Sequence, residues 1–324
     1  MPQMTLEEYR SSGIPVIDIG PLRDGSNPVP VAKALHRASR EVGFLYVTNH
    51  GISEQSINRI RDAAKTFFRH DEEDKNTVAV SGAHRGYLGL GGAVMQSGMP
   101  PDLKESFIWG YENADGLAPD DHSLRGRNKW PLFVPELRSI AMDYFKQVHA
   151  VAHRLMTGFA LGLGLPGDAF LKTSDRPLSR ASLVNYPPQS DVEQTGEFGV
   201  GPHTDFGVLT VLCQDMTGGL EVEALDGTWV PAPPIPNTLV VNVGDLLARW
   251  TNGKYRSTPH RVINSSGHER LSLVLAYDPE PQTMIDPRDI LGQDCDPNQP
   301  PISCGDYLTW RFERAFSYRK PVTL

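Results

Sequence analysis

The second half of the chain constrains the fold most, because after Pro177 the sequence becomes a series of short β-rich runs. Glycine, proline, asparagine and aspartate separate these runs, and these residue types favour turns. Several short strands at regular spacing are typical of a sandwich, a jelly roll or a barrel. The runs lie at about residues 182–186, 207–213, 219–224, 238–243, 258–264 and 271–277.

The first half is predicted to be largely helical, with strands over residues 14–19 and 44–48. Apolar residues recur at helical spacing over residues 29–42, and Gly43 is expected to end that helix. Ser53 is expected to cap the next helix. Glycine-rich residues 81–101 are predicted to form a mobile surface loop. Two more helices are expected, over about residues 134–163 and 304–316.

We therefore expect a mainly β fold with flanking helices that forms one body. Its parts are predicted to be an N-terminal helical and β portion (1–130), a bracing helix (131–175), a β core (176–282), and a C-terminal helix and tail (283–324). With 39% hydrophobic and 22% charged residues among 324, the chain can bury a sizeable core.

Composition excludes several classes of function. The formal charge of −8 argues against nucleic acid or an anionic membrane surface as the main partner. No run approaches the roughly 18 apolar residues of a membrane span. Three cysteines without CxxC spacing make a disulfide framework or a thiolate zinc site improbable and favour a reducing cytoplasm. A small-molecule substrate and a monomer or weak homo-oligomer are expected.

Metal-ligating residues occur in the segment Gly201–Gly207, which holds His203 and Asp205. Residues i and i+2 of an extended chain point to the same face, so an imidazole and a carboxylate can meet at one metal. His260 follows in another β-like run. Two histidines and one carboxylate leave three positions of an iron open, as in non-haem Fe(II) oxygenases. A hydrogen-bonded strand histidine and a surface His-x-Asp pair are the alternatives.

A candidate anion site follows ten residues after His260. Arg270 and Ser272 share a strand face, and a guanidinium with a hydroxyl suits a carboxylate. An arginine among strand leucines is costly to bury without an anion, although a surface salt bridge is the alternative. Tyr186 in the segment Asn185–Pro188 can add a donor to the same carboxylate, unless it is a core tyrosine.

These pieces occur in one order, and the whole chain resembles the Fe(II)/2-oxoglutarate-dependent dioxygenase superfamily, in the branch that includes isopenicillin N synthase and plant flavonoid and hormone oxygenases. The resemblance covers nearly the whole chain. The matching stretches are Ile14–Asp18 (IPVID), Val42–Ile52 (VGFLYVTNHGI), Asp102–Phe107 (DLKESF), Asn185–Pro188 (NYPP), His203–Thr210 (HTDFGVLT), Gly218–Leu220 (GGL), Asn242–Asp245 (NVGD), Asn252–Gly253 (NG), Ser257–Val262 (STPHRV) and Arg270–Ser272 (RLS).

The resemblance implies a distorted double-stranded β-helix, or jelly roll, braced by a helical N-terminal portion. It implies that His203, Asp205 and His260 bind Fe(II). It also implies that Arg270 and Ser272 bind the distal carboxylate of 2-oxoglutarate with help from Tyr186. The expected activity is oxidation, by default hydroxylation, of a small metabolite with O₂, releasing succinate and CO₂.

Two other functions stay open at this point. A same-fold oxidase of the isopenicillin N synthase type uses Fe(II) and O₂ without 2-oxoglutarate, and a non-catalytic small-molecule binding protein can also adopt the fold. By family position, the substrate-pocket walls are expected to include loop 82–98, the Phe107/Trp109 region, Phe206 and the C-terminal helix. Arg85 is expected to be a solvent-exposed loop residue or, alternatively, to meet a substrate carboxylate.

Overall fold

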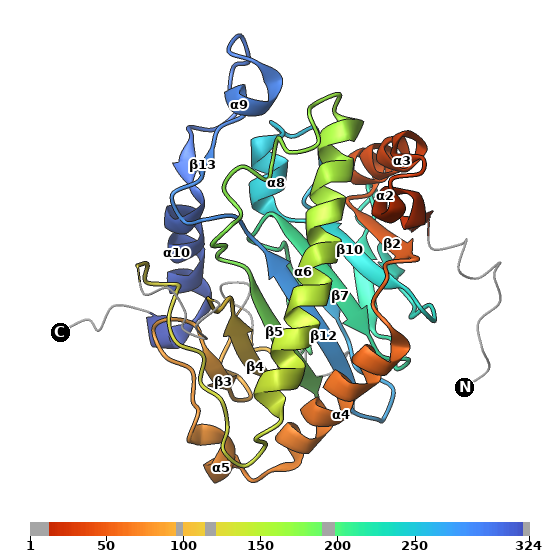
Figure 1. The fold of residues 1–324 in the computed structure, drawn as a ribbon. Coiled ribbons are helices and arrows are strands. Elements are labelled where there is room, and N and C mark those ends of the chain that lie inside the picture. Colours follow the sequence, from red (N-terminus) through yellow and green to blue (C-terminus); the bar gives the residue numbers. More distant parts are fainter. Residues whose placement is uncertain (1–12, 95–99, 114–120, 190–197, 320–324) are drawn as a thin grey trace.

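The computed structural model describes residues 13–94, 100–113, 121–189 and 198–319. Two β-sheets form its centre (Figure 1). The larger has eight strands in the order β1 (Val16–Asp18), β2 (Phe44–Thr48), β10 (Leu239–Val243), β7 (Leu209–Gln214), β12 (Arg270–Tyr277), β5 (Arg180–Tyr186), β4 (Glu105–Gly110) and β3 (Gly86–Leu88). The smaller has the order β6 (Val200–His203), β11 (His260–Val262), β8 (Leu220–Glu223) and β9 (Trp229–Pro231).

The inner faces of the two sheets enclose one apolar cluster, so the strands form a two-layered β structure. Side chains from both sheets meet in it, among them Tyr46, Val184 and Val240 of the large sheet and Val200, Leu220 and Val262 of the small one. The expected mainly β fold with flanking helices is confirmed, and the division of the chain at residues 130, 175 and 282 stays a prediction.

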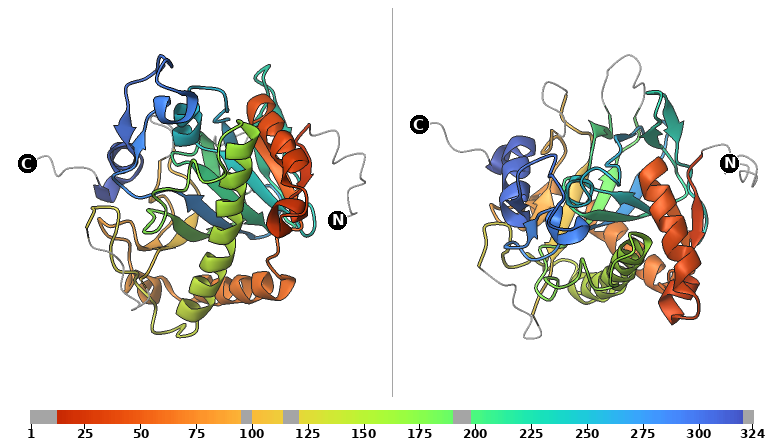
Figure 2. Two further views of the ribbon diagram at one scale, coloured as in Figure 1. Left: turned by 45° about the horizontal axis from the view of Figure 1, so that its top comes forward. Right: turned by 90° about the horizontal axis from the view of Figure 1, so that it is seen from above.

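Helices cover the opposite face of the large sheet. The longest, α6 (Leu137–Gly162), crosses β7 and β12, with α3 (Pro28–Glu41) and α4 (Glu54–Arg69) packed beside it (Figure 1). Seen from above, α3 and α6 lie on the same side of that sheet (Figure 2). The remaining helices are short or peripheral: α2 (Gly20–Asp24), α5 (Glu72–Asn76), α8 (Asp245–Trp250), α9 (Arg288–Leu291), α10 (Cys304–Ala315) and the 3₁₀ turn η1 (Ser317–Arg319). A two-stranded ribbon joins β13 (Met284–Ile285) to β14 (Ile302–Ser303).

Local signals fix the helix ends near the positions that the sequence predicts. Ser53 accepts a hydrogen bond from the backbone N–H of Ser56 over 3.1 Å and so caps α4. Gly43 follows α3 with φ of 76°, and a Cβ atom there would lie 2.4 Å from the carbonyl oxygen of Arg256. Glycine is therefore required where the chain turns from α3 into β2.

The prediction of a mobile loop over residues 81–101 is wrong for its described first part. His84 and Arg85 are buried, and Gly86–Leu88 pairs with β4 as the edge strand β3. Residues 95–99 lie outside the described residues. Within the parts of the chain that the structure describes, no helix combines the length and apolar character needed to cross a membrane.

Candidate metal centre and adjoining cavity

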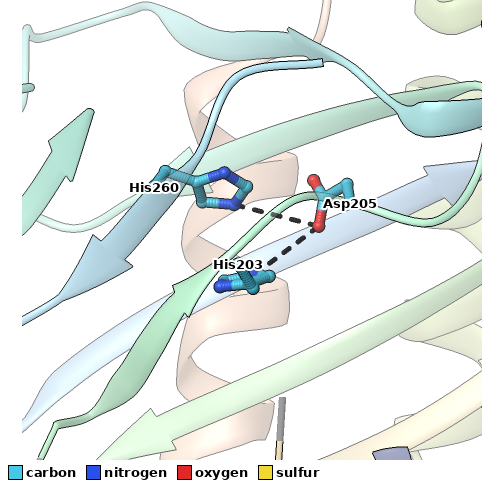
Figure 3. A group of neighbouring side chains, drawn as sticks. All are labelled: His203, Asp205 and His260. Carbon is cyan, nitrogen blue, oxygen red and sulfur yellow. Dashed lines mark ion pairs between the residues drawn. The ribbon is translucent and has the colours of Figure 1, made fainter. Parts of the chain in front are cut away.

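Three predicted ligands come together at one point between the two sheets. His203 ends β6 and pairs directly with His260, the first residue of β11, while Asp205 lies in the loop after β6. One ligand atom from each residue lies within 4.8 Å of the other two. The Nε2 atoms of both histidines are 3.8 Å from Oδ1 of Asp205 (Figure 3).

Hydrogen bonds on the outer side of each ligand fix its orientation. Nδ1 of His203 lies 2.8 Å from the carbonyl oxygen of Gly201, and Nδ1 of His260 lies 3.2 Å from that of Thr258. Because a carbonyl only accepts, each Nδ1 carries a proton, and in the neutral ring Nε2 then holds the lone pair that a metal needs. This arrangement is the one that metal-binding histidines use.

The ionisation states also suit a metal. Burial, and then the neighbouring His260, lower the pKa of His203 to about 3. Burial acts to raise the pKa of Asp205, but His260, His203 and the amide of Asn242 outweigh it and lower that pKa to about 2. At neutral pH, His203 is therefore neutral and Asp205 is ionised, as coordination requires.

Two aspartates, Asp245 and Asp278, hold the loop that carries Asp205, one through its backbone and the other through its side chain. The backbone N–H of Asp245 donates to the carbonyl oxygen of Asp205 over 2.8 Å. Three residues beyond Asp205, the N–H of Val208 donates over 3.0 Å to Oδ1 of Asp278, which is fully buried. The ligand-bearing turn is thus fixed from both sides, one by α8 and the other by the end of β12.

A cluster of unpaired donors lies at one end of the same cavity. Arg270 is fully buried; its Nε donates to the carbonyl oxygen of Gly218 over 2.6 Å, while Nη1 and Nη2 have no partner. The hydroxyl of Ser272 is also buried without a partner. Tyr186, opposite Arg270 in the β5–β12 pair, stacks its ring 4.7 Å from the guanidinium carbon. Such orphaned donors are costly to bury unless an anion occupies the site.

The triad and this donor cluster line one cavity of about 180 Å³. Alternate residues of β4, β5 and β12 form one wall, as the period of two along a strand requires. This alternation shows which of the residues predicted to form the substrate-pocket wall face the cavity. Ser106 and Ile108 line the cavity, whereas Phe107 and Trp109 face the helices and do not belong to it. Arg85 is buried and not solvent-exposed.

The other residues predicted to form the substrate-pocket wall line two adjoining cavities. Phe316, just beyond α10, lines the cavity, and Phe206 lines an adjoining one. Loop 82–98 is also among the predicted walls, and its described residues His84 and Leu88 line the cavity. Sequence reasoning missed Lys104, Asn242 and Arg180, which line one or other cavity. Asn242 and Lys104 stand in stretches that carry the resemblance, which was the available signal; Arg180 carried none.

The donor set fits a metal with open coordination positions. Two imidazole nitrogens and one carboxylate oxygen face a cavity, and the described residues offer no fourth ligand of the His, Cys, Asp or Glu type, which is the arrangement of a facial iron site. The unpaired guanidinium and hydroxyl at the end of that cavity fit a carboxylate. Iron with a carboxylate-bearing cosubstrate would fill both.

Comparison with known proteins decides the family. Residues 14–132 match the family described as the N-terminal region of non-haem dioxygenases in morphine synthesis. The 2OG-Fe(II) oxygenase superfamily matches residues 178–279. A homoarginine-6-hydroxylase of Glycine max is 34% identical over 296 residues, 86% of this chain and 89% of that protein. The chain belongs to the 2OG-Fe(II) oxygenase superfamily.

Solved structures of this superfamily agree with the fold and the cofactors. A full-length Neurospora crassa protein in complex with α-ketoglutarate (2-oxoglutarate) superposes with a TM-score of 0.83 at 29% identity, covering 93% of this chain and 96% of that one. JOX2, crystallised with 2-oxoglutarate, iron and JA, gives a TM-score of 0.76 at 27% identity, with 94% and 89% covered. The chain is a 2-oxoglutarate-dependent oxygenase that uses Fe(II) and O₂, and the expected jelly-roll fold is confirmed. The oxidase and binding-protein alternatives are disfavoured.

Proposed function

We propose that His203, Asp205 and His260 bind the Fe(II) of this oxygenase. We also propose that Arg270 and Ser272, with Tyr186 beneath the guanidinium, bind the distal carboxylate of 2-oxoglutarate. The observation that carries the proposal is the set of buried, unpaired donors of Arg270 and Ser272 in the same cavity as the free Nε2 atoms. Nη1 and Nη2 of Arg270 and Oγ of Ser272 have no hydrogen-bond partner among the described residues.

Each proposed residue has a definite task. The Nδ1–H contacts of the two histidines keep Nε2 available, and Asn242 leaves Oδ1 of Asp205 facing both of them. Arg270 and Ser272 fix one end of the cosubstrate, which sets the position of its other end before reaction. Bound Fe(II) supplies the site at which O₂ is activated. Apolar walls from the two sheets exclude water from that site.

The overall reaction we propose is hydroxylation. One C–H bond of the substrate becomes C–OH, and O₂ provides both this oxygen and the one that converts 2-oxoglutarate into succinate and CO₂. The relative from Glycine max bears the name of a hydroxylase, and the Neurospora crassa protein was also crystallised with thymine, so a small-molecule substrate is supported. We expect the enzyme to act in the cytoplasm as a monomer or weak homo-oligomer.

An anaerobic titration tests the residue assignments. Apoprotein receives Fe(II) and then 2-oxoglutarate, while the visible metal-to-ligand charge-transfer band is followed. We expect a saturable band that is absent in His203→Ala and that requires far more 2-oxoglutarate in Arg270→Gln. A normal band in His203→Ala would remove that residue from the ligand set. Iron binding without any band in the wild type would restore the oxidase alternative.

A further inference from the structure

The cavity continues beyond the metal centre into a second space of about 140 Å³. The two spaces share Asp205, His84, Ile108, Ser182 and Phe316, so they adjoin at the metal centre. A cavity of roughly 150 Å³ is enough for a benzene molecule. The second space therefore suits one small ring or a short chain next to the metal centre. Its other lining residues are Arg180, Phe206, Ala276 and Phe312.

Strand β5 connects this space with the proposed cosubstrate site. Arg180, Ser182, Val184 and Tyr186 alternate along β5 and all line one or other of the two spaces. Tyr186 is paired opposite Arg270, whereas Arg180 is paired opposite Ala276 at the far end of the same two strands. Six residues of strand span roughly 20 Å. An arginine thus stands at each end of the cavity, with Asp205 lining both spaces between them.

The guanidinium of Arg180 has more N–H donors than the described residues use. Its Nη1 donates to Oδ2 of Asp278 over 2.8 Å, and its guanidinium carbon lies 4.6 Å from the ring of Phe312. A guanidinium has five N–H donors. No other acceptor within hydrogen-bonding distance of Arg180 is found among the residues that the structure describes. The side chain is 13% exposed, and the space that it lines is the second cavity.

The charge at this end of the cavity is positive. Arg85 is buried; among the described residues it donates only to the carbonyl oxygens of Ala83 and His84, and its Nε has no partner there. It packs on Gly110, which is paired opposite Arg180. Asp278 balances one of these two guanidinium groups. Asp205, the carboxylate that lines the space, faces the two imidazoles and is taken up by the proposed metal, so a positive charge remains at the Arg180 end. An anion is favoured here, and an ammonium or guanidinium group is disfavoured.

His84 adds a neutral polar contact on the same wall. Its Nδ1 is hydrogen-bonded to the hydroxyl of Tyr318, which leaves Nε2 for a ligand. Burial, and then the nearby Arg180, Arg85 and Arg319, hold the pKa of His84 well below its usual value. The ring packs against Phe312 and Phe316 at centroid distances of 4.5 and 4.7 Å. The imidazole therefore offers one hydrogen bond within an otherwise aromatic wall.

We infer that the substrate of this oxygenase is a small carboxylate, whose anionic group binds Arg180 and whose compact apolar body lies against Phe206, Phe312 and Phe316. This inference rests on the proposed function, because it takes the triad as the reacting centre. A single carboxylate anchored on Arg180 holds the adjoining carbon chain toward the triad. Ser182, between the two ends of β5, lies beside that chain.

The test compares carboxylates with their uncharged amides. Enzyme loaded with Fe(II) and saturating 2-oxoglutarate is titrated anaerobically by calorimetry with phenylacetate and phenylacetamide, and with cyclohexanecarboxylate and its amide. We expect at least one carboxylate to bind about tenfold or more tightly than its amide, as an ionic hydrogen bond provides. The double variant Arg180→Gln/Asp278→Asn removes both charges of the buried pair and is expected to abolish this preference without leaving an unpaired charge.

Two further variants make the result specific. Asp278→Asn alone keeps a side-chain oxygen to accept from the N–H of Val208, which holds the Asp205 loop, but removes the charge that pairs with Arg180. It is expected to tighten carboxylate binding while the charge-transfer band stays normal. Arg176→Gln removes a half-exposed arginine that pairs with Asp121 outside the cavity, and is expected to keep the wild-type preference. If Arg176→Gln lost the preference for carboxylates to the same extent, the preference would be an effect of net charge, which would contradict the assignment of Arg180 as the anion-binding residue.

The outcomes separate this inference from the proposed function. The substrate assignment would be overturned if the amides bound as well as the carboxylates, or if none of the four compounds bound. A normal charge-transfer band in the same protein would show that the proposed cosubstrate site is not affected by that result. Carboxylate binding that 2-oxoglutarate competes away would place the anion at Arg270 and likewise overturn it. Loss of the band itself in the wild type would instead contradict the proposed function.

Discussion

Asn242 donates a hydrogen bond from Nδ2 to Oδ2 of Asp205 over 2.7 Å, and this contact determines which carboxylate oxygen faces the two imidazoles. The other oxygen, Oδ1, lies 3.8 Å from both Nε2 atoms. Asn242 is buried on β10, so a strand of the large sheet orients a ligand that belongs to a loop. The geometry of the centre therefore depends on both sheets.

Replacing Asn242 with alanine is expected to weaken Fe(II) binding by about 10- to 100-fold, the usual effect of losing a group that orients a metal ligand. The measurement is an anaerobic Fe(II) titration, with circular dichroism to show that the fold is kept. Asn128→Ala is the matched control, because Asn128 also makes side-chain hydrogen bonds, to the backbone of Gly110, but lies away from the cavity. Equal Fe(II) affinities for Asn242→Ala and the wild type would contradict this role.

Arg270→Met is expected to act in opposite directions on stability and on cosubstrate binding. Without 2-oxoglutarate, the buried guanidinium leaves two nitrogens unpaired, so an apolar side chain of similar length should stabilise the protein by about 1 kcal/mol or more. The same change should remove the rise in Tm that 2-oxoglutarate gives the wild type.

Thermal unfolding of both proteins, with and without 2-oxoglutarate, measures the two effects together. Ser272→Ala is expected to keep a smaller cosubstrate-dependent rise, because it removes one neutral donor. If the Arg270→Met variant still gains the full wild-type rise in Tm, Arg270 is excluded from cosubstrate binding.

The free energy of unfolding is expected to fall as the pH drops from about 6.5 toward 4. Burial, and then the nearby His153, lower the pKa of His149 to about 4, and Nε2 of His149 is buried without a partner. The unfolded chain binds this proton first, so the stabilising contribution is complete above pH 6.5 and is lost below it. The loss from this residue is at most about 3 kcal/mol.

Urea unfolding at pH 7.5 and 4.5 measures this dependence. His149→Phe keeps an aromatic ring in contact with Phe145 and Tyr277 and should reduce the difference between the two pH values. An unchanged difference would show that other groups carry the pH dependence.

Gly43→Ala is expected to lower the free energy of unfolding by more than about 2 kcal/mol, because a left-handed backbone and a steric clash act together. The added Cβ would lie 2.4 Å from the carbonyl oxygen of Arg256 and from Oγ1 of Thr258. Gly25→Ala is the matched control: its φ is 74°, but no atom lies within 4 Å of its Cβ position. It should cost about 1 kcal/mol, and equal losses for the two variants would disprove the clash.

Much of the fold could be predicted because strong local signals agreed with it. The helical periodicity of α6 and the cap at Ser53 are properties of adjacent residues, and the structure has both. Strand β4 could not be predicted, since all six of its residues are buried and the sequence shows no alternation. Its Glu105 is buried only because Lys75, Tyr87 and Asn185 bind it. Those partners are distant in sequence.

The candidate site was likewise predictable only where its residues lie close together in sequence. The spacing of His203 and Asp205, and of Arg270 and Ser272, indicates shared faces, and the resemblance joined them with His260; their roles stay predictions. The substrate walls were harder. Without alternation in β4, nothing indicated whether Phe107 or Ser106 faced inward, and the first choice was wrong. Arg180 lines the second space only because β5 pairs with β4 and β12, which are distant in sequence.

The pairing of β5 with β12 restricts how such an enzyme can diversify. Arg270, Ser272 and Val274 face the cavity, while Leu271, Leu273 and Leu275 belong to the core against the helices. A one-residue insertion in β12 would exchange these two sets, so the proposed cosubstrate contacts and the core packing would be lost together. This combined loss is not expected from point substitutions at Arg180 and Ser182 or from changes in loop length. New substrates are therefore accessible to descendants of this chain mainly through those positions.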